Sequence, residues 1–439
     1  MANRLAGNIS GTFITRVVII AMGVVGSVIT ARFLGPAGKG ILATLAVISG
    51  TVMQFGNFGL HASNTYFIAK NKDLTRQVII NALYTGLVGG TLITGLAFLA
   101  IHLSPAFLGN VPTNLIYLTL ITIPISFIIM FFQNILIGQG RVRLFNYFEL
   151  GASMFGLAGI IIIFLLLHFS IYALVIFSTI TAGLAAIFYV LSLKKYIYFP
   201  LYFNGRLFRQ MLQYGYKSYI ASLLSYFIIR SDILLLNYFR GSAETGIYSI
   251  AVQFNDFLYL LPMTSGLMLF PTIAAQPDNQ EKTRITQHLS RHISIIMACL
   301  CLVGALAVFP VVKMLYGQAF IQAVWPFLIL LPGIYFLSIE TILMNDFGGR
   351  GLPPIVYIAP ACGLVFNVLV NIIAIPRFGM NIAAATSSIG YGITLYLAGR
   401  YFIRLTNSRW SELILPRRQE IRETLNWAIG IVRNKIKGS

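Results

Sequence analysis

Twelve apolar runs, each of about 20 residues, constrain this chain of 439 residues more than any other feature. A run of about 20 apolar residues is long enough to cross the hydrocarbon core of a bilayer as a helix. Only 10% of the residues are charged, against about a quarter in a soluble domain. The pattern predicts an all-α integral membrane protein with twelve transmembrane helices, with eleven or thirteen as alternatives because the break at Ser170 is short. The predicted spans are Thr12–Phe33, Ile41–Ala69, Ile79–Leu103, Asn114–Ile137, Tyr147–Phe169, Ile171–Leu193, Ser218–Tyr238, Ile247–Phe270, Ile293–Tyr316, Ala323–Met344, Ile355–Ile375 and Ile382–Ile403.

A short motif, Phe33–Ile41, occurs a second time as Phe239–Ile247. Phe, Gly, Ala, Gly and Ile recur at the same spacing, and each copy lies between two apolar runs. Because glycine adopts backbone angles that other residues avoid, each copy predicts a tight turn between two membrane helices. The recurrence of this turn together with its flanking runs predicts a duplicated helical bundle.

The basic residues predict the orientation of the spans. If the N-terminus is placed in the cytoplasm, most of the 31 lysines and arginines fall in cytoplasmic connections, where membrane proteins are enriched in them. We therefore expect both termini to be cytoplasmic and the two six-helix halves to be parallel repeats. We expect no cleavable signal peptide, because the first apolar run leads on into further spans. The formal charge of +19 then reflects membrane topology, and we expect no nucleic-acid partner.

The predicted halves are residues 1–195 and 218–404, joined by a basic and aromatic cytoplasmic linker, residues 196–217. Residues 405–439 leave the membrane as a cytoplasmic tail. Between Arg417 and Lys437, apolar residues recur at helical spacing with basic residues between them. This pattern is typical of an amphipathic helix on the lipid surface, and a partner-binding helix is the alternative.

Several motifs in a fixed order resemble those of one transporter superfamily. They are Arg32-Phe33-Leu34-Gly35-Pro36, Phe55–Leu60, Ser231–Leu235, Gly246–Tyr248, Phe270-Pro271, Gly349–Pro353 and Ala383–Ala385. The chain, to about Arg404, resembles the polysaccharide-exporter branch of the multidrug/oligosaccharidyl-lipid/polysaccharide exporter (MOP) superfamily, and most of all the O-antigen flippases.

This resemblance implies two six-helix bundles around a central cavity that opens to each side of the membrane in turn. It implies an undecaprenyl-pyrophosphate-linked oligosaccharide as substrate, moved from the cytoplasmic to the outer leaflet of a bacterial cytoplasmic (inner) membrane during surface-polysaccharide biosynthesis. It implies no cofactor. The sugar, the coupling ion and a polysaccharide polymerase as a further partner are left open.

Two arginines lie inside predicted spans away from the outer ends, where a charge costs on the order of 3 kcal/mol unless it faces water or a partner. Arg230 lies near the centre of the seventh span, and Arg16 lies toward the cytoplasmic end of the first. A pyrophosphate that crosses the membrane needs cations along its route. We therefore predict that Arg230 and Arg16 bind substrate. The alternatives are a structural ion pair for Arg230 and snorkelling to the interface for Arg16.

Polar residues within other spans are further candidates. Asn255 and Asp256 in the eighth span and Asn64 in the second are predicted to contact sugar hydroxyls, although such groups also join helices to one another. If a proton or sodium gradient drives transport, an acid at membrane depth should bind the coupling ion. The candidates for that role are Asp232, Asp256 and Glu340.

Enzymatic function is not expected. The sequence has no metal-spaced His/Cys set, no triad-like cluster and no phosphate-cradling Gly-Lys-Ser/Thr motif, so we predict no catalytic residues and no metal. A polytopic polymerase or glycosyltransferase of the same pathway is one alternative, against which the short external loops argue. A drug/cation antiporter of the same superfamily is another, although it would favour an acidic cavity over the two arginines. A peptidoglycan-precursor flippase is a third, and twelve rather than fourteen spans argue against it.

Overall fold

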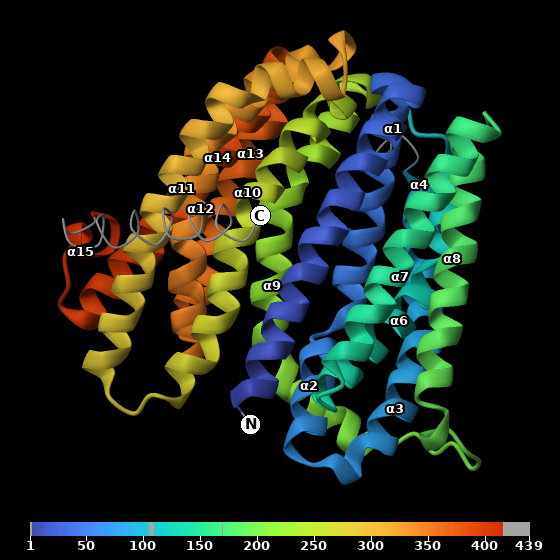
Figure 1. Ribbon diagram of the computed structural model, residues 1–439, viewed down its shortest axis with the longest axis vertical. Helices are drawn as coiled ribbons and strands as arrows, with labels where there is room; N and C mark the ends of the chain where they lie inside the picture. Colours follow the sequence, from blue (N-terminus) through green and yellow to red (C-terminus); the bar gives the residue numbers. More distant parts are fainter. Residues whose placement is uncertain (1, 105–108, 169, 416–439) are drawn as a thin grey trace, which may run out of the picture. The chain divides into compact units, whose positions relative to one another are not determined.

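A computed structural model describes residues 2–104, 109–168 and 170–415, with side chains from Thr15 onward, and this part of the chain is almost entirely helical (Figure 1). The predicted tail helix, Arg417–Lys437, lies outside the described residues. The longer helices are α1 (Ala2–Asn57), α2 (Leu60–Lys70), α3 (Thr75–Tyr84), α4 (Gly90–Leu103), α5 (Thr113–Ile121), α6 (Ile123–Gly138), α7 (Val142–Ile161), α8 (Ile171–Ser192), α9 (Gly205–Arg240), α10 (Ser242–Ala275), α11 (Asn279–Leu315), α12 (Val324–Gly349), α13 (Ile355–Phe378) and α14 (Met380–Thr406). The short helix α15 spans Trp410–Ile414.

Ten helical segments among the described residues are long and apolar enough to cross a membrane. One of them, Thr15–Asn57, has 43 residues, and at 1.5 Å per residue it would extend about 65 Å, roughly twice the hydrocarbon thickness. It contains the first predicted span and most of the second, whereas the twelfth predicted span corresponds to α14, which is not among the ten. The all-α membrane fold is therefore confirmed. The count of twelve spans and the parallel repeat remain predictions.

Helix α1 consists of two arms that meet at Gly35. This residue has φ 65° and ψ −174°, which interrupts the helix, and Pro36 follows it. Lys39 Nζ lies 2.8 Å from Ser27 Oγ, although residues 12 apart in a straight helix would be separated by about 18 Å. Figure 1 shows the blue ribbon of α1 turning back on itself.

The described chain divides into two compact units. The first contains residues up to Ser249 and Leu315–Phe320, and the second contains Ile250–Met314 and the residues from Ile321 onward. Helix α9 and the first turns of α10 thus belong to the first unit. The domain boundaries expected from the sequence, residues 195, 217 and 404, remain predictions.

Each unit has its own core. In the first unit, α6 is buried through Phe127, Phe131 and Phe132. In the second, a buried polar network joins α13 to α14: Asn371 Nδ2 donates to Asn367 Oδ1 (2.9 Å), and Thr386 Oγ1 donates to Asn371 Oδ1 (2.5 Å). Such hydrogen bonds fix the packing of membrane helices, where the hydrophobic effect does not drive them together.

Candidate functional site

The two copies of the repeated motif are both turns, and they face each other within the first unit. Gly35 and Gly241 occupy the same place in each copy and both have positive φ, 65° and 82°. The second glycine that the two copies share, Gly40 or Gly246, lies against the other copy. A Cβ at Gly40 would overlap the Ser242 carbonyl oxygen and lie 2.8 Å from Gly246 N, and a Cβ at Gly246 would lie 2.7 Å from Gly40 N. The contact is therefore reciprocal and backbone to backbone.

Hydrogen bonds hold α9, which carries Arg230, against the second arm of α1. The Tyr226 hydroxyl donates to the Val47 carbonyl (3.0 Å), and Gln54 Nε2 donates to Ser222 Oγ (2.9 Å). The Arg230 side chain is half-buried, and its charge acts on the Tyr226 hydroxyl one turn earlier. Arg230 is therefore a cation at membrane depth on a helix whose position is fixed by polar contacts.

Asp232 lies close to Arg230 in sequence but in a different environment. It is 1% exposed. Its carboxylate accepts hydrogen bonds from the Tyr248 hydroxyl of α10 (2.5 Å) and from the Ile233 backbone N–H (2.8 Å). The bond from Tyr248 connects α9 to α10 beside the turn at Gly241, and the bond from Ile233 is within α9. Asp232 thus occupies a buried helix–helix contact, and its ion-coupling role remains a prediction.

Arg16 lies on the first arm of α1 and forms an ion pair with Glu149 of α7 (3.5 Å). Its guanidinium lies 5.7 Å from the centre of the Phe145 ring, and its side chain is 45% exposed. Gln133 of α6 donates to the other carboxylate oxygen of Glu149 (2.5 Å). An ion pair this exposed contributes little to stability, and it leaves both sequence interpretations of Arg16 open.

Asn64 is buried in the first unit. It lies beside Leu60, Phe131 and Met211, and within the described part of the chain its amide has no hydrogen-bond partner at either atom. A buried amide without partners is costly. The sugar-contact role of Asn64 remains a prediction.

Two of the predicted ion-coupling acids lie on helices that meet in the second unit. The Tyr259 hydroxyl of α10 lies 2.8 Å from Thr341 Oγ1 of α12; Asp256 precedes Tyr259 by three residues and Glu340 precedes Thr341 by one. Glu340 is buried, and no described residue forms an ion pair or hydrogen bond with its carboxylate. The Oδ1 atom of nearby Asn255 is also buried without a partner among the described residues. These groups form a polar cluster inside apolar helices.

The sequence interpretation did not include Tyr259. Its position three residues after Asp256 places it on the same face of α10, and this spacing was the signal that could have found it. Among the described residues, no group of three His, Cys, Asp or Glu side chains could hold a metal ion.

Residues 29–325 match the model of a protein family described as "Polysaccharide biosynthesis protein". The chain belongs to this family. The match covers most of the predicted spans, and it confirms the resemblance to the polysaccharide branch of the superfamily that the motifs indicated.

Relatives of this polysaccharide biosynthesis protein include two from archaea. An uncharacterized membrane protein of Methanocaldococcus jannaschii is 26% identical in an alignment of length 317 residues, and this alignment covers 66% of this chain and 60% of the relative. The probable flippase AglR of Haloferax volcanii is 25% identical over 175 residues, 38% of this chain and 37% of the relative. The chain thus matches less than two thirds of the length of each.

Two solved structures share its fold. An inward-facing multidrug resistance transporter of the MATE family, in the MOP superfamily, superposes with a TM-score of 0.75 at 13% identity, over 90% of this chain and 98% of that one. The lipid II flippase MurJ, in an inward closed conformation, gives a TM-score of 0.69 at 14% identity, over 97% of this chain and 99% of that one. The fold is therefore MATE-like, and it is common to a drug transporter and a lipid flippase.

Proposed function

We propose that this multi-pass membrane protein is a flippase. It moves an undecaprenyl-pyrophosphate-linked oligosaccharide from the cytoplasmic to the outer leaflet by alternating access, during the biosynthesis of O-antigen, capsule or exopolysaccharide. The cell is bacterial, the membrane is the cytoplasmic (inner) one, and both termini are cytoplasmic. The names of curated relatives support the transport class, since both AglR and Agl15 of Haloferax volcanii are described as probable flippases.

The single observation that carries this proposal is the match to a polysaccharide biosynthesis family in a chain whose described residues include ten helices long and apolar enough to cross a membrane. Transport is a step of such a pathway that requires a protein to cross the bilayer. A pyrophosphate and its glycan cannot enter hydrocarbon without losing their hydration, so they need a polar path through protein. A non-enzymatic transporter supplies that path.

Arg230 is proposed to contact the pyrophosphate, and Arg230→Ala tests this role. A hydrogen bond to a charged group contributes about 1.5–3 kcal/mol, so its loss should slow flipping by at least about ten-fold. The measurement is the rate at which an undecaprenyl-pyrophosphate oligosaccharide becomes accessible to a lectin outside proteoliposomes. Arg230→Lys keeps the charge and should retain part of the rate.

Arg240→Ala is the matched control for this experiment. Arg240 ends the same helix and pairs with Glu244 (2.8 Å) at an exposed position, so its removal should leave the flipping rate within about two-fold of wild type. Wild-type flipping by Arg230→Ala would remove Arg230 from the substrate path. Growth of polymer on added precursor, without any lipid movement, would instead reveal a polymerase.

The cluster around Tyr259 is proposed to bind the coupling ion through Asp256 and Glu340. Glu340→Gln keeps the shape of the side chain and removes its charge, so flipping should no longer respond to an imposed proton or sodium gradient. Glu281→Gln is the control, because Glu281 lies on α11 of the same unit and is 41% exposed. A gradient response that survives in Glu340→Gln would exclude this residue from coupling.

The same acids favour a second candidate function, a drug/cation antiporter. Carboxylates inside a membrane protein attract cations, and a MATE transporter shares the fold. The proteoliposome assay separates the two functions when an organic cation is added beside the lipid-linked oligosaccharide. Movement of the drug alone would establish the antiporter, and movement of the lipid alone would establish the flippase.

A further inference from the structure

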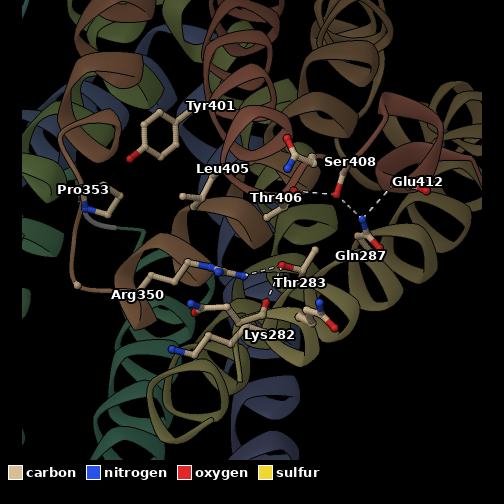
Figure 2. A pocket seen from close by; sticks show the side chains of 14 residues that line it. Lys282, Thr283, Gln287, Arg350, Pro353, Tyr401, Leu405, Thr406, Ser408 and Glu412 are labelled. Atoms are coloured by element: carbon tan, nitrogen blue, oxygen red, sulfur yellow. Dashed lines mark hydrogen bonds between the residues drawn. The ribbon is translucent and has the colours of Figure 1, made fainter. Parts of the chain in front are cut away.

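A polar pocket of about 650 Å³ lies in the second unit, away from every substrate and ion candidate discussed above (Figure 2). Three parts of the chain form its walls: the first turns of α11, the connection between α12 and α13, and the end of α14 with α15. Its volume falls in the range of sites that hold small ligands. The residues that matter here are Lys282, Arg350, Gln287, Glu412 and Tyr401.

One wall of the pocket is cationic. Arg350 Nε donates to Asp346 Oδ2 (2.6 Å), and Arg350 Nη2 donates to Thr283 Oγ1 (3.3 Å). A guanidinium has five N–H groups, so the other three have no acceptor among the described residues. Lys282 lines the same side of the pocket (Figure 2), and no described residue forms a hydrogen bond or ion pair with its ammonium group. This wall therefore presents the Arg350 guanidinium, held in place by its hydrogen bonds, and the positive charge of Lys282.

The polar side chains in the rest of the lining are neutral or already form hydrogen bonds with one another. Gln287 Nε2 donates to Ser408 Oγ (2.7 Å) and to Glu412 Oε2 (3.4 Å), as the dashed lines in Figure 2 show. The same Glu412 oxygen accepts the Arg409 backbone N–H (3.0 Å). Glu412 is the one carboxylate that lines the pocket, against two cations. Asp346 already pairs with Arg350, so Lys282 supplies the positive charge that no described carboxylate pairs, and this charge favours an anion.

The pocket lies where membrane-spanning segments end. Helix α11 begins at Asn279, α12 ends at Gly349 and α13 begins at Ile355, and the pocket lies between these ends. These ends lie outside or at the edge of the predicted membrane spans Ile293–Tyr316, Ala323–Met344 and Ile355–Ile375, which is where a lipid headgroup can reach the lining. Tyr401 and Leu405 contribute an apolar side, and a tyrosine with one apolar and one polar end suits the interface.

We propose that this pocket binds the phosphate group of an anionic phospholipid headgroup, with Arg350 and Lys282 as the phosphate contacts. A planar guanidinium with free N–H groups matches the oxygens of a phosphate, and basic pockets between helices at a membrane surface bind such headgroups. The inference does not depend on which substrate the transporter moves.

The test measures lipid retention by the purified full chain in detergent, using native mass spectrometry. Phosphatidylglycerol is compared with phosphatidylcholine, which carries an additional positive charge. The wild-type protein should retain phosphatidylglycerol preferentially. Lys282→Gln should weaken that binding about five-fold, the effect expected for one basic residue at a membrane surface.

Arg284→Gln is the matched control. Arg284 lies two residues further along α11, is 82% exposed and does not line the pocket, so its removal should leave the preference intact. Equal retention of the two lipids by the wild-type protein would overturn the proposal. Equal losses in Lys282→Gln and Arg284→Gln would also overturn it, because they would indicate general surface charge.

A second experiment, with inorganic phosphate, tests whether the pocket binds the phosphate group of a lipid or that of a soluble compound. It is added at millimolar concentration, and the melting temperature of the lipid-free protein is followed, since a ligand that binds only the folded state raises this temperature. Protection by phosphatidylglycerol alone supports a lipid headgroup. Equal protection by inorganic phosphate would mean that the pocket takes a soluble phosphate compound, and the lipid assignment would be wrong.

Discussion

Replacing Gly40 with alanine is expected to destabilise the first unit by about 3 kcal/mol, at the upper end of the usual range for overpacking. The added methyl group would overlap the Ser242 carbonyl oxygen and crowd Gly246 N. Both neighbours are backbone atoms, so no side chain can rotate away, and the two turns would have to separate. The melting temperature of the purified protein in detergent is measured. Its readout is the loss of the monodisperse peak in size-exclusion chromatography.

Gly23→Ala is the matched control, because it adds the same methyl group to the same helix. No atom lies within 4 Å of a Cβ at Gly23, and alanine favours a helix over glycine by about 1 kcal/mol. This variant should melt at or above the wild-type temperature. Gly246→Ala should reproduce the effect of Gly40→Ala, since its methyl group would overlap the Pro36 carbonyl oxygen. Wild-type melting by Gly40→Ala would contradict the close contact of the two turns.

The repeated motif shows how far the sequence could predict this region. A glycine at the end of an apolar run indicates a turn, and Gly35 and Gly241 do adopt positive φ. The local sequence pattern did not predict the backbone-to-backbone contact at Gly40 and Gly246. Their constraint comes from a contact between segments about 200 residues apart, and no local pattern records which backbone will lie against a given glycine.

Hydropathy predicted the apolar central parts of the helices but not the polar N-terminal turns of two of them. The seventh and ninth spans were expected to start at Ser218 and Ile293, whereas α9 begins at Gly205 and α11 at Asn279. The signals were present as helix caps. Asn204 Oδ1 accepts the Leu207 N–H (2.9 Å) at the start of α9, and such side chains stabilise a helix start whether or not apolar residues follow.

The candidate site was predictable as a set of residue types and not as a geometry. A charge within an apolar run is visible in the sequence, which is how Arg230, Asp256 and Glu340 were found. That Asp256 and Glu340 lie on two helices that meet at Tyr259 depends on the packing of α10 against α12. The pairing of Arg16 with Glu149 likewise joins residues 133 apart, and such long-range pairs leave no trace in local periodicity.

Replacing Asp346 with alanine is expected to destabilise the second unit by about 3–5 kcal/mol, the effect of removing one partner of a buried ion pair. The Asp346 side chain is 0% exposed and that of Arg350 is 11% exposed. Asp346 also accepts a hydrogen bond from Thr286 Oγ1 (2.7 Å). Without the carboxylate, the buried guanidinium would lose its ion-pair partner, and the Thr286 hydroxyl would keep its bond to the Lys282 carbonyl (3.0 Å). The measurement is again the melting temperature in detergent.

Glu281→Ala provides the contrast for this prediction. Glu281 pairs with Arg284 at 3.8 Å, with the two side chains 41% and 82% exposed. Solvent screens such a pair, which contributes at most about 1 kcal/mol, so the melting temperature should hardly change. Equal losses in the Asp346 and Glu281 variants would mean that Arg350 is not held by a buried carboxylate.

The double variant Asp346→Leu/Arg350→Leu separates the structural role of Arg350 from its proposed role in binding phosphate. Because it leaves no buried charge, it should recover part of the stability that Asp346→Ala loses. It also removes the guanidinium from the pocket, so the preference for phosphatidylglycerol should fall even though the protein is folded. A stable double variant that still prefers phosphatidylglycerol would exclude Arg350 as a phosphate contact, because a folded protein without its guanidinium would then bind the lipid equally well.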